Sequence, residues 1–287
     1  MVAQSAQIPH PDLATSTAQP LLSLSVVIPF YQRLPHLLKC LRSLYRSAWQ
    51  AGQAGRMEII VQDDASPDFD LTELILPPEP AKVERNPANL GFAGNCNAGA
   101  RRAQGDVLLF LNQDTRAREG WFDPLMAMFD DPLVGIVGPK LLARVLVVEK
   151  WQTIEIETLQ SCGGLYDAGR GPYHRYLGWH PDDRRVNQKE RMSWTTGAAL
   201  AIRRDLFNRI GGFDEGYRRG YFEDVDLCEK AKAAGSEVWY CPDAIFDHQV
   251  GSTGGIPPEQ FRANSLRFHE RWDQHITPDS PAVYVNY

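Results

Sequence analysis

Short apolar runs alternate with stretches in which apolar residues recur every three or four positions along the first half of the chain. The helical spacing covers residues 34–49 and 93–103, the second after a turn at Gly91, and residues 71–76 fit a short helix. Four runs have the length and apolar content of strands: 23–30, 57–62, 82–85 and 106–111. Continuous apolar strands separated by helices predict an α/β fold, with a mostly parallel central sheet covered by helices on both faces.

The second half has a less regular pattern. We expect one helix from Asp205, as its N-cap, to residue 210, and another over 223–234 that ends at Gly235. In the second helix, Glu229 and Lys230 are expected to face solvent. The strand-like runs are 135–141, 151–159, 194–202 and 238–240. This change of pattern predicts a mixed half that follows a regular α/β half.

The composition is that of an ordinary soluble globular protein, since 43% of the 287 residues are hydrophobic and 23% are charged. The net charge of -6 argues against a general nucleic-acid binder, because no basic excess exists to displace counterions from phosphates. Five widely spaced cysteines without a CxxC motif predict packed, reduced thiols in a cytosolic protein. Residues 1–22 are predicted to be a disordered tail rather than a signal peptide, and no membrane span is expected.

Polar residues follow the ends of three predicted strands. In parallel sheets ligands bind beyond the carboxyl ends of the strands, so these positions indicate a binding site. Asp63 and Asp68 fit turn capping in the run DASPD. Asp64 fits either a turn or a hydrogen bond to a base or ribose. The polar strand ends are Tyr31-Gln32-Arg33, Asp63-Asp64 and Asn112-Gln113-Asp114.

Residues 86–99 (NPANLGFAGNCNAG) are rich in asparagine and glycine just before a predicted helix. They fit a loop with left-handed residues, and they also fit a backbone that approaches an anionic ligand closely. Neither GxGxxG nor GxxxxGK is present, so the phosphate loops of dehydrogenases and kinases are absent.

Asp114 is the single acid in LLFLNQDT, where an apolar strand ends. Thr115 is compatible with a capped turn at this point. One carboxylate cannot cage a divalent ion, but one carboxylate with a ligand diphosphate and water forms the open, oxygen-rich arrangement that Mg²⁺ prefers. The residues alone leave both interpretations open.

Glu223 and Asp224 follow two aromatic residues at the start of a predicted helix. Acids at this position favour the helix dipole, and a carboxylate held near apolar surface is also a natural general base. His248 is the best-placed metal-ligand candidate among seven histidines, although a structural role also fits it.

Seven segments, in order from about residue 24 to 253, are together similar to family-2-type inverting glycosyltransferases with the GT-A fold, especially the rhamnosyltransferase-like bacterial branch. The resemblance implies a GT-A domain over 23–255, with a donor half at about 23–115, an acceptor half at about 116–255 and a helical extension over 256–287. The segments are SVVIPFYQR, MEIIVQDDASPD, NPANLGFAGNCNAGARRAQGDVLLFLNQDT, VGPKLL, WTTGAALAIRRDLFNRIGGFDE, YFEDVDLCEKAKAAG and HQVGST.

The resemblance implies a donor linked to UDP, dTDP or GDP, and roles for individual residues. Asp224 would be the catalytic base with Glu223 beside it. Asp114, the last residue of the family's DxD-like motif, would bind Mg²⁺ or Mn²⁺ together with His248. Because Asn112 replaces the first acid of that motif, metal affinity without the nucleotide should be low. The donor-binding residues would be Pro29, Tyr31, Asp64, Asn89, Gly91, Asn95, Asn112 and Asp114. Contacts to the donor or acceptor sugar would come from Trp194, Thr196 and Gly197.

The implied reaction is metal-dependent transfer of a sugar, rhamnose-like donors included, to a glycan or lipid-linked acceptor. Bacterial surface polysaccharide or glycolipid synthesis, in the cytoplasm or at the inner membrane face, would be its setting. Two alternatives stay open. A sugar-nucleotide nucleotidyltransferase needs a glycine-rich loop after the first strand, and IPFYQRLPHLL has no glycine. A catalytically silent sugar-nucleotide-binding protein would not need Asp114, Glu223 and Asp224 together.

Apolar residues recur at roughly helical spacing in the C-terminal extension. Phe261, Phe268, Trp272 and Ile276 form this set, and arginines lie between them. The pattern fits an interfacial helix in peripheral contact with a membrane, and it also fits packing against the body of the protein.

Overall fold

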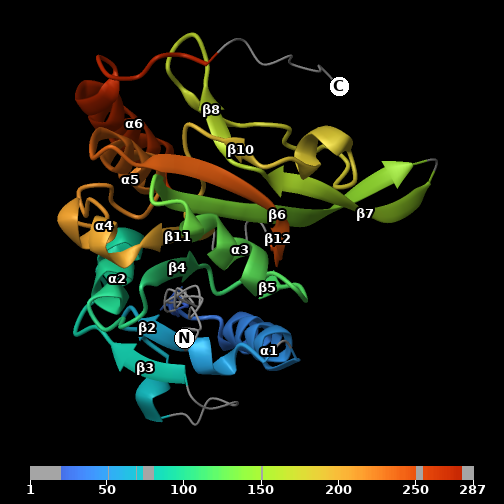
Figure 1. The fold of residues 1–287 in the computed structure, drawn as a ribbon, viewed down its shortest axis with the longest axis vertical. Helices are drawn as coiled ribbons and strands as arrows, with labels where there is room; N and C mark the ends of the chain where they lie inside the picture. Colours follow the sequence, from blue (N-terminus) through green and yellow to red (C-terminus); the bar gives the residue numbers. More distant parts are fainter. Residues whose placement is uncertain are drawn as a thin grey trace, which may run out of the picture.

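The computed structural model of the protein describes residues 21–50, 52–68, 70–73, 81–149, 151–249 and 255–279. Nearly all of the predicted tail at 1–22, the end of the predicted helix at 71–76 and the last eight residues of the extension lie outside these ranges. Within them, strands from the first and the second half of the sequence form one 10-stranded sheet (Figure 1). Its order is β10-β12-β6-β11-β4-β1-β2-β3, with β5 paired to β12 and β7 paired to β6.

The sheet is built from strands of both halves of the sequence. Its strands are β1 (Leu24–Phe30), β2 (Met57–Asp63), β3 (Ala81–Arg85), β4 (Val107–Leu111), β5 (Thr115–Ala117), β6 (Val134–Glu149), β7 (Gln152–Ser161), β10 (Glu190–Arg191), β11 (Ala199–Arg203) and β12 (Glu237–His248). A separate two-stranded sheet consists of β8 (Gly164–Tyr166) and β9 (Pro172–His174).

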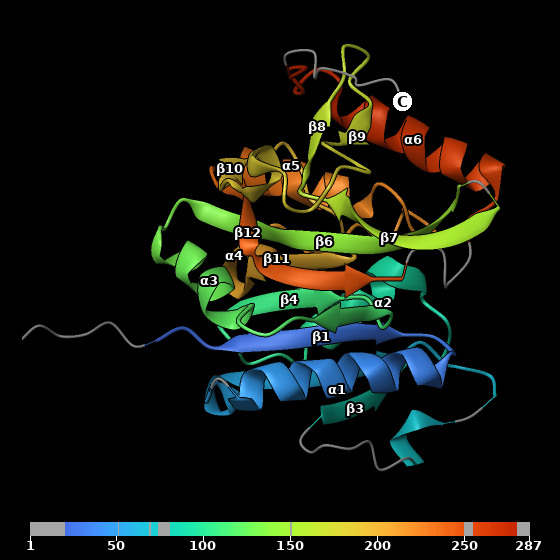
Figure 2. The ribbon, with the colours of Figure 1, turned by 90° about the vertical axis from the view of Figure 1, so that its right-hand side faces the viewer.

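Helices cover the sheet on both faces (Figure 2). They are α1 (Leu34–Gln50), α2 (Gly91–Ala100), α3 (Phe122–Ala127), α4 (Arg204–Arg209), α5 (Glu223–Ala233) and α6 (Pro258–Trp272). Short 3-10 turns occur at η1 (Ala54–Arg56), η2 (Leu71–Glu73), η3 (Met128–Asp130) and η4 (Arg184–Asn187).

Strands β3, β2, β1 and β4 are parallel, as the continuous apolar runs predicted. Strand β11 runs antiparallel to β4 and to β6, so the second half mixes the two directions. The predicted fold class, a mostly parallel α/β sheet in the first half with a mixed second half, is confirmed. One sheet joins the two halves, and therefore their strand ends share an edge.

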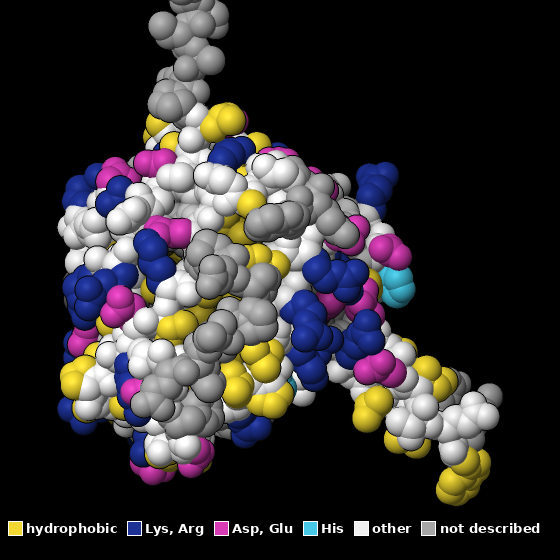
Figure 3. Space-filling model, turned by 90° about the horizontal axis from the view of Figure 1, so that it is seen from below, with side chains coloured by type: hydrophobic (Ala, Val, Ile, Leu, Met, Phe, Trp, Pro, Cys, Tyr) yellow, Lys and Arg dark blue, Asp and Glu magenta, His cyan; other side chains and the backbone are white. Residues whose placement is uncertain are grey.

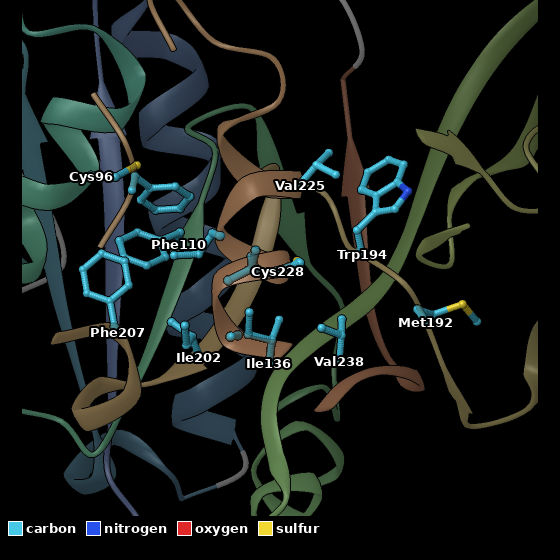
Figure 4. Packing of buried hydrophobic residues seen from close by; sticks show 14 of the residues in the cluster. Cys96, Phe110, Ile136, Met192, Trp194, Ile202, Phe207, Val225, Cys228 and Val238 are labelled. Carbon is cyan, nitrogen blue, oxygen red and sulfur yellow. The ribbon is translucent and has the colours of Figure 1, made fainter. Parts of the chain in front are cut away.

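Successive residues of the central strands point into two different cores. Val27 of β1 packs in one cluster with residues of α2, α4, α5 and α6, whereas Val26 and Ile28 pack in the other with α1 and α3. In the first cluster, the rings of Phe110 and Phe207 lie 5.1 Å apart between their centroids (Figure 4). Fully apolar strands follow from burial on both faces.

Several predicted boundaries are corrected. The strand predicted at 194–202 begins only at Ala199, because the preceding residues turn away from the sheet and Trp194 bridges to Gly164. The strand predicted at 238–240 is much longer and ends at His248. Asp205 lies in the first turn of α4 rather than at its N-cap, which is Arg203.

The predicted exposure of α5 is also wrong at two positions. Glu229 is buried and accepts a hydrogen bond from the Tyr166 hydroxyl at 2.5 Å. The ammonium group of Lys230 donates to the carbonyl oxygen of Gly212. These charges face other segments of the second half of the chain, because β8 and the segment after α4 cover this side of the helix.

The distal parts of β6 and β7 form a hairpin arm that projects from the body, with hydrophobic side chains at its end (Figure 3). Val145 and Val147 pair with Ile156 and Ile154, and all four side chains are exposed. Trp151 at the tip is 100% exposed. The half-exposed strand predicted at 151–159 is therefore confirmed as one strand of this arm.

The buried cysteines and α6 agree with packing interpretations. All five cysteines are free and buried, as predicted for packed thiols. In the extension, Phe268, Trp272 and Ile276 are buried, so the packing interpretation of this helix is confirmed for them, whereas Phe261 is 44% exposed. None of the helices in the described ranges has the length and hydropathy needed to cross a membrane.

Candidate active site

Asp64 follows β2 and is held by the loop that begins α2. Its carboxylate accepts hydrogen bonds from the backbone amides of Leu90 at 2.8 Å and Gly91 at 2.9 Å, and from the Asn86 side chain at 2.9 Å. Gly91 has φ 75°, a conformation that glycine adopts without strain. Burial raises the pKa of Asp64, and the three donors oppose that rise. The carboxylate therefore fixes the loop and keeps room for about one further hydrogen bond.

Buried amide side chains support this loop from below. The Asn86 amide also donates to Asn95 Oδ1 at 2.8 Å, and Asn86 Oδ1 accepts from Gln62 Nε2 at 2.9 Å. Asn95 donates to the carbonyl oxygen of Gln62 at 3.0 Å. The predicted site residue Asn95 thus lies beneath the loop, whereas Asn89 lies in it and donates to the Asp64 carbonyl oxygen at 3.3 Å.

Asp63 has a structural role, as its turn-capping interpretation predicted. It forms an ion pair with Arg85 and accepts hydrogen bonds from the backbone and hydroxyl of Ser66 at 3.0 and 2.6 Å. Adjacent aspartates therefore separate into one that closes the turn and one that holds the α2 loop, because side chains alternate direction at a strand end.

Asp114 lies opposite His248, although 133 residues separate them in the sequence. His248 Nε2 is 3.2 Å from Asp114 Oδ1, because β12 ends with His248 paired to Thr115. Thr115 also closes a turn on the carbonyl oxygen of Asn112, with its hydroxyl 2.7 Å away. The turn is made by Thr115, which leaves the Asp114 carboxylate directed at the histidine. The turn interpretation of this strand end is therefore confirmed for Thr115, and metal binding by Asp114 stays a prediction.

Gln160 at the end of β7 orients the histidine. Its Oε1 lies 2.8 Å from His248 Nδ1, which is the distance of a hydrogen bond. If Nδ1 carries the proton, Nε2 presents a lone pair toward Asp114, which is the usual arrangement of a metal-binding histidine. Nothing in the sequence pattern pointed to Gln160, because its role depends on a strand pairing between distant segments.

Glu223 and Asp224 begin α5, and their carboxylates have different surroundings. Asp224 Oδ2 accepts a hydrogen bond from the Gly197 amide at 2.8 Å, and Oδ1 accepts from the Val225 amide at 2.9 Å. Glu223 is buried, and its Oε2 has no hydrogen-bond partner among the described residues. Burial raises the pKa of both acids, and the charge of Asp224 raises the pKa of Glu223 further.

The segments that carry Asp114 and bind Asp224 lie side by side at one edge of the sheet. The Asn112 amide donates to the carbonyl oxygen of Ala198 at 2.9 Å, which places the segment before Asp114 beside the segment that binds Asp224. A side chain at Gly197 would meet Phe92 at 3.3 Å and Asp224 at 3.5 Å, so the backbone approaches both closely. The predicted residues Gly197 and Thr196 therefore adjoin Asp224 directly, and a Thr196 hydrogen bond lowers the pKa of Asp224.

The first strand end completes this edge. The Tyr31 amide donates to Gln113 Oε1 at 3.0 Å, which ties the end of β1 to the Asp114 loop. The Tyr31 side chain is 44% exposed, while Pro29 is partly buried in β1. Gln113 was not singled out by its sequence position, and it links two of the predicted polar strand ends.

Trp194 occupies a different environment from the other predicted sugar contacts. It is buried, it packs against Gly164, and its indole donates to the carbonyl oxygen of Leu165 at 3.2 Å. This placement gives Trp194 a clear packing function, and its contact with a sugar stays a prediction.

Residues 25–211 match the model of the family "Glycosyl transferase family 2", and the chain belongs to this family. It is 28% identical to the N-acetylglucosaminyl-diphospho-decaprenol L-rhamnosyltransferase of Mycobacterium tuberculosis over 84% of this chain and 81% of that protein. The pre-mycofactocin glycosyltransferase of the same species is 26% identical over 78% of this chain, which spans only 42% of that relative.

A crystal structure of GalNAc-T7 with UDP, GalNAc and Mn²⁺ has the same fold. It superposes with a TM-score of 0.69 at 22% identity, and the match covers 89% of this chain and 49% of that one. The fold is therefore GT-A, as the resemblance in the sequence implied. The matched relatives include much longer proteins, so the chain corresponds to one part of them.

Proposed function

We propose that this protein is an inverting glycosyltransferase that moves a sugar from a nucleotide-diphosphate sugar to an acceptor hydroxyl. The observation that carries the proposal is a chain of contacts: Asp114 faces His248, and Asn112, two residues before Asp114, donates to the carbonyl oxygen of Ala198, whose neighbour Gly197 donates to Asp224. A single displacement requires a base on one side of the anomeric carbon and a site for the leaving diphosphate on the other side.

Asp114 and His248 would hold a divalent cation, and the donor diphosphate would supply further oxygen ligands. A carboxylate and an oriented imidazole are the correct donor types for Mg²⁺ or Mn²⁺, and their 3.2 Å separation allows both to reach one ion. Across the described ranges no set of three or more His, Cys, Asp or Glu side chains converges, so most oxygen ligands must come from the nucleotide and water. When bound, the metal would neutralise charge on the leaving nucleoside diphosphate.

Asp224 acts as the general base in this proposal. Its carboxylate takes the proton of the acceptor hydroxyl while that oxygen bonds to the anomeric carbon. The bond from this carbon to the diphosphate oxygen breaks, the electron pair leaves with the nucleoside diphosphate, and the configuration inverts. The raised pKa of Asp224 makes it a better base, and the Gly197 amide fixes its orientation. Buried Glu223 lies beside it, and its Oε2 has no hydrogen-bond partner among the described residues.

The nucleotide lies, in this proposal, over the ends of β1 and β2. Tyr31 would contact the base, Pro29 would line its site, and Asp64 would use its remaining acceptor capacity on the base or ribose. Asn89 and Gly91 would place the loop against the nucleotide, with Asn95 beneath it. The donor would be a UDP-, dTDP- or GDP-linked sugar.

The acceptor is proposed to be a glycan or a lipid-linked saccharide in bacterial surface polysaccharide or glycolipid synthesis. Support comes from the similarity to a mycobacterial L-rhamnosyltransferase named for a diphospho-decaprenol acceptor. We also propose a rhamnose-like donor, which the name of that relative supports, and action in the cytoplasm or at the inner membrane face.

A screen of UDP-, dTDP- and GDP-sugars tests the proposal. We expect one donor to be hydrolysed slowly, and to raise the melting temperature, only when Mg²⁺ or Mn²⁺ is present. Asp224→Asn should keep the thermal stabilisation and lose the turnover. Stabilisation without turnover in the wild type would support a silent binding protein, and nucleotide-sugar synthesis from a sugar phosphate and a nucleoside triphosphate would support a nucleotidyltransferase.

A further inference from the structure

The loop that leads into α5 has an unusual backbone. Arg219, Gly220, Tyr221 and Phe222 have φ values of 64°, 113°, 70° and 75°, so four successive residues are left-handed. For the three that carry a side chain, this conformation is strained, because Cβ comes too close to the following carbonyl oxygen. Such a backbone persists only where the surrounding structure holds it in place.

One side chain of α6 gathers the carbonyl groups of this loop. The Asn264 amide nitrogen donates to the carbonyl oxygens of Gly220 at 2.8 Å, Arg218 at 3.1 Å and Tyr221 at 3.3 Å. Asn264 is 1% exposed, and its Oδ1 accepts from Gln260 Nε2 at 2.9 Å. Both polar atoms of the buried amide therefore have hydrogen-bond partners. The partners of its nitrogen, Nδ2, are all carbonyl oxygens of this loop.

The loop determines where α5 begins. Phe222 is the N-cap residue of α5, it makes no side-chain cap, and its carbonyl oxygen accepts the Asp226 amide at 2.8 Å. Glu223 and Asp224 are the next two residues. The backbone nitrogen of Arg219 also lies 3.8 Å from where a side chain at Gly91 would begin, so the loop reaches the donor side as well.

The helix α6 has further contacts that do not involve this loop's carbonyls. The indole of Trp272 donates to Asp226 Oδ1 at 2.8 Å, and Arg271 contacts the same oxygen at 3.0 Å. Phe268 and Ile276 are buried beneath the helix and its end. The rings of Tyr221 and Phe222 also contact Phe261 and Phe268 of α6. Removing the Asn264 amide should therefore leave α6 and these rings docked while the carbonyl groups of the loop lose their common donor.

We propose that Asn264 is a positioning residue for the Glu223–Asp224 pair, an inference that rests on the function proposed above for these acids. It acts through the backbone of the loop and touches no substrate. By holding three carbonyl oxygens at one point, it keeps the left-handed loop closed and sets the direction in which the two acids point.

The first test compares Asn264→Ala with Ile276→Ala, a control that removes buried apolar contacts of the same extension. We expect Asn264→Ala to lower kcat about tenfold to a hundredfold, the cost of a small misplacement of catalytic groups, with little change in the donor KM. Asn264→Asp, which keeps the shape but removes the donors, should behave alike. Ile276→Ala should lower the melting temperature as much as Asn264→Ala does, but its kcat should stay at the wild-type value. Near wild-type kcat in Asn264→Ala, or an equal kcat loss in Ile276→Ala, overturns the proposal.

Hydrogen exchange provides a readout that does not depend on turnover. The Asp226 amide should exchange faster in Asn264→Ala, because its bond to Phe222 closes the first turn, whereas the Ala231 amide in the last turn of α5 should not change. If wild-type protein transfers no sugar from any donor, the proposed function fails, and this exchange pattern alone decides whether Asn264 positions the pair. Unchanged exchange at Asp226 contradicts the positioning role in either case.

Discussion

Asp64 on the donor side and Glu223 on the acceptor side are both buried acids at the same sheet edge, yet their surroundings differ. Asp64 receives three hydrogen bonds from the α2 loop, two of them from backbone amides. Glu223 has one carboxylate oxygen without a partner in the described part of the chain and lies beside Asp224. Hydrogen bonds that satisfy an acid make it a structural element, whereas an unsatisfied buried acid retains capacity for a ligand or a proton.

The largest expected effect tests the acceptor side. Asp224→Asn should lower kcat by about 10²–10⁴-fold, because an amide cannot take the acceptor proton. The nucleotide affinity should stay close to that of the wild type. The exposed Asp205 in α4 provides a matched control, since Asp205→Asn should leave kcat unchanged. Steady-state transfer assays and nucleotide titration measure both quantities, and a fully active Asp224→Asn protein would falsify the base assignment.

The metal pair should give the next largest effect. Gln160→Ala should weaken Mn²⁺ binding to the nucleotide complex by about 10–100-fold, because His248 loses the partner that orients it. Calorimetric Mn²⁺ titration with and without nucleoside diphosphate measures this. We expect weak binding to the nucleotide-free protein, since the protein offers one carboxylate and one imidazole at this point. Tight Mn²⁺ binding without nucleotide contradicts the shared-ligand arrangement.

Asp64→Asn tests the donor side, where stability should change more than chemistry. The new amide would place a donor against the backbone amides of Leu90 and Gly91, so the free energy of unfolding should fall by about 1–3 kcal/mol. Nucleotide affinity should fall with it, while kcat at saturating donor changes little. Asp68→Asn in the same DASPD turn is exposed and serves as the control. A large kcat loss with unchanged stability would assign Asp64 to catalysis instead.

The smallest effect concerns pH. The folded-state pKa of Glu223 is raised, so the folded protein favours its protonated form. This contribution to stability is complete below the ordinary pKa of 4.5 and is lost as the pH rises through the raised value. Ligand-free wild type should therefore lose stability relative to Glu223→Gln as the pH increases above 4.5. Parallel unfolding curves of the two proteins at every pH would show that Glu223 is ionised without cost.

Much of the fold and site was predictable because it depends on short stretches of sequence. The centres of β1, β2 and β4, at 26–28, 59–61 and 107–111, are apolar because both faces of each strand are buried there, and polar residues follow near the end of each strand. The strand at 194–202 was predicted too long, since an apolar run does not reveal that Gly197 turns toward Asp224. The burial of Glu229 and the Lys230 contact were missed because Tyr166 and the Gly212 carbonyl group, which cover this side of α5, lie on other elements.

The sequence by itself determined the α/β class, the parallel strands of the first half and the acids that follow them. Each of these depends on a local pattern: apolar continuity, helical spacing or a residue type at a strand end. Only the tertiary structure decided that Gln160 orients His248 opposite Asp114 and that Asn264 holds the loop before Glu223. These contacts join residues from 43 positions apart (264 − 221, Asn264 and Tyr221) to 134 positions apart (248 − 114, His248 and Asp114). Contacts between side chains on different elements depend on how those elements pack. They produce no periodic pattern along the sequence, so the sequence alone does not predict them.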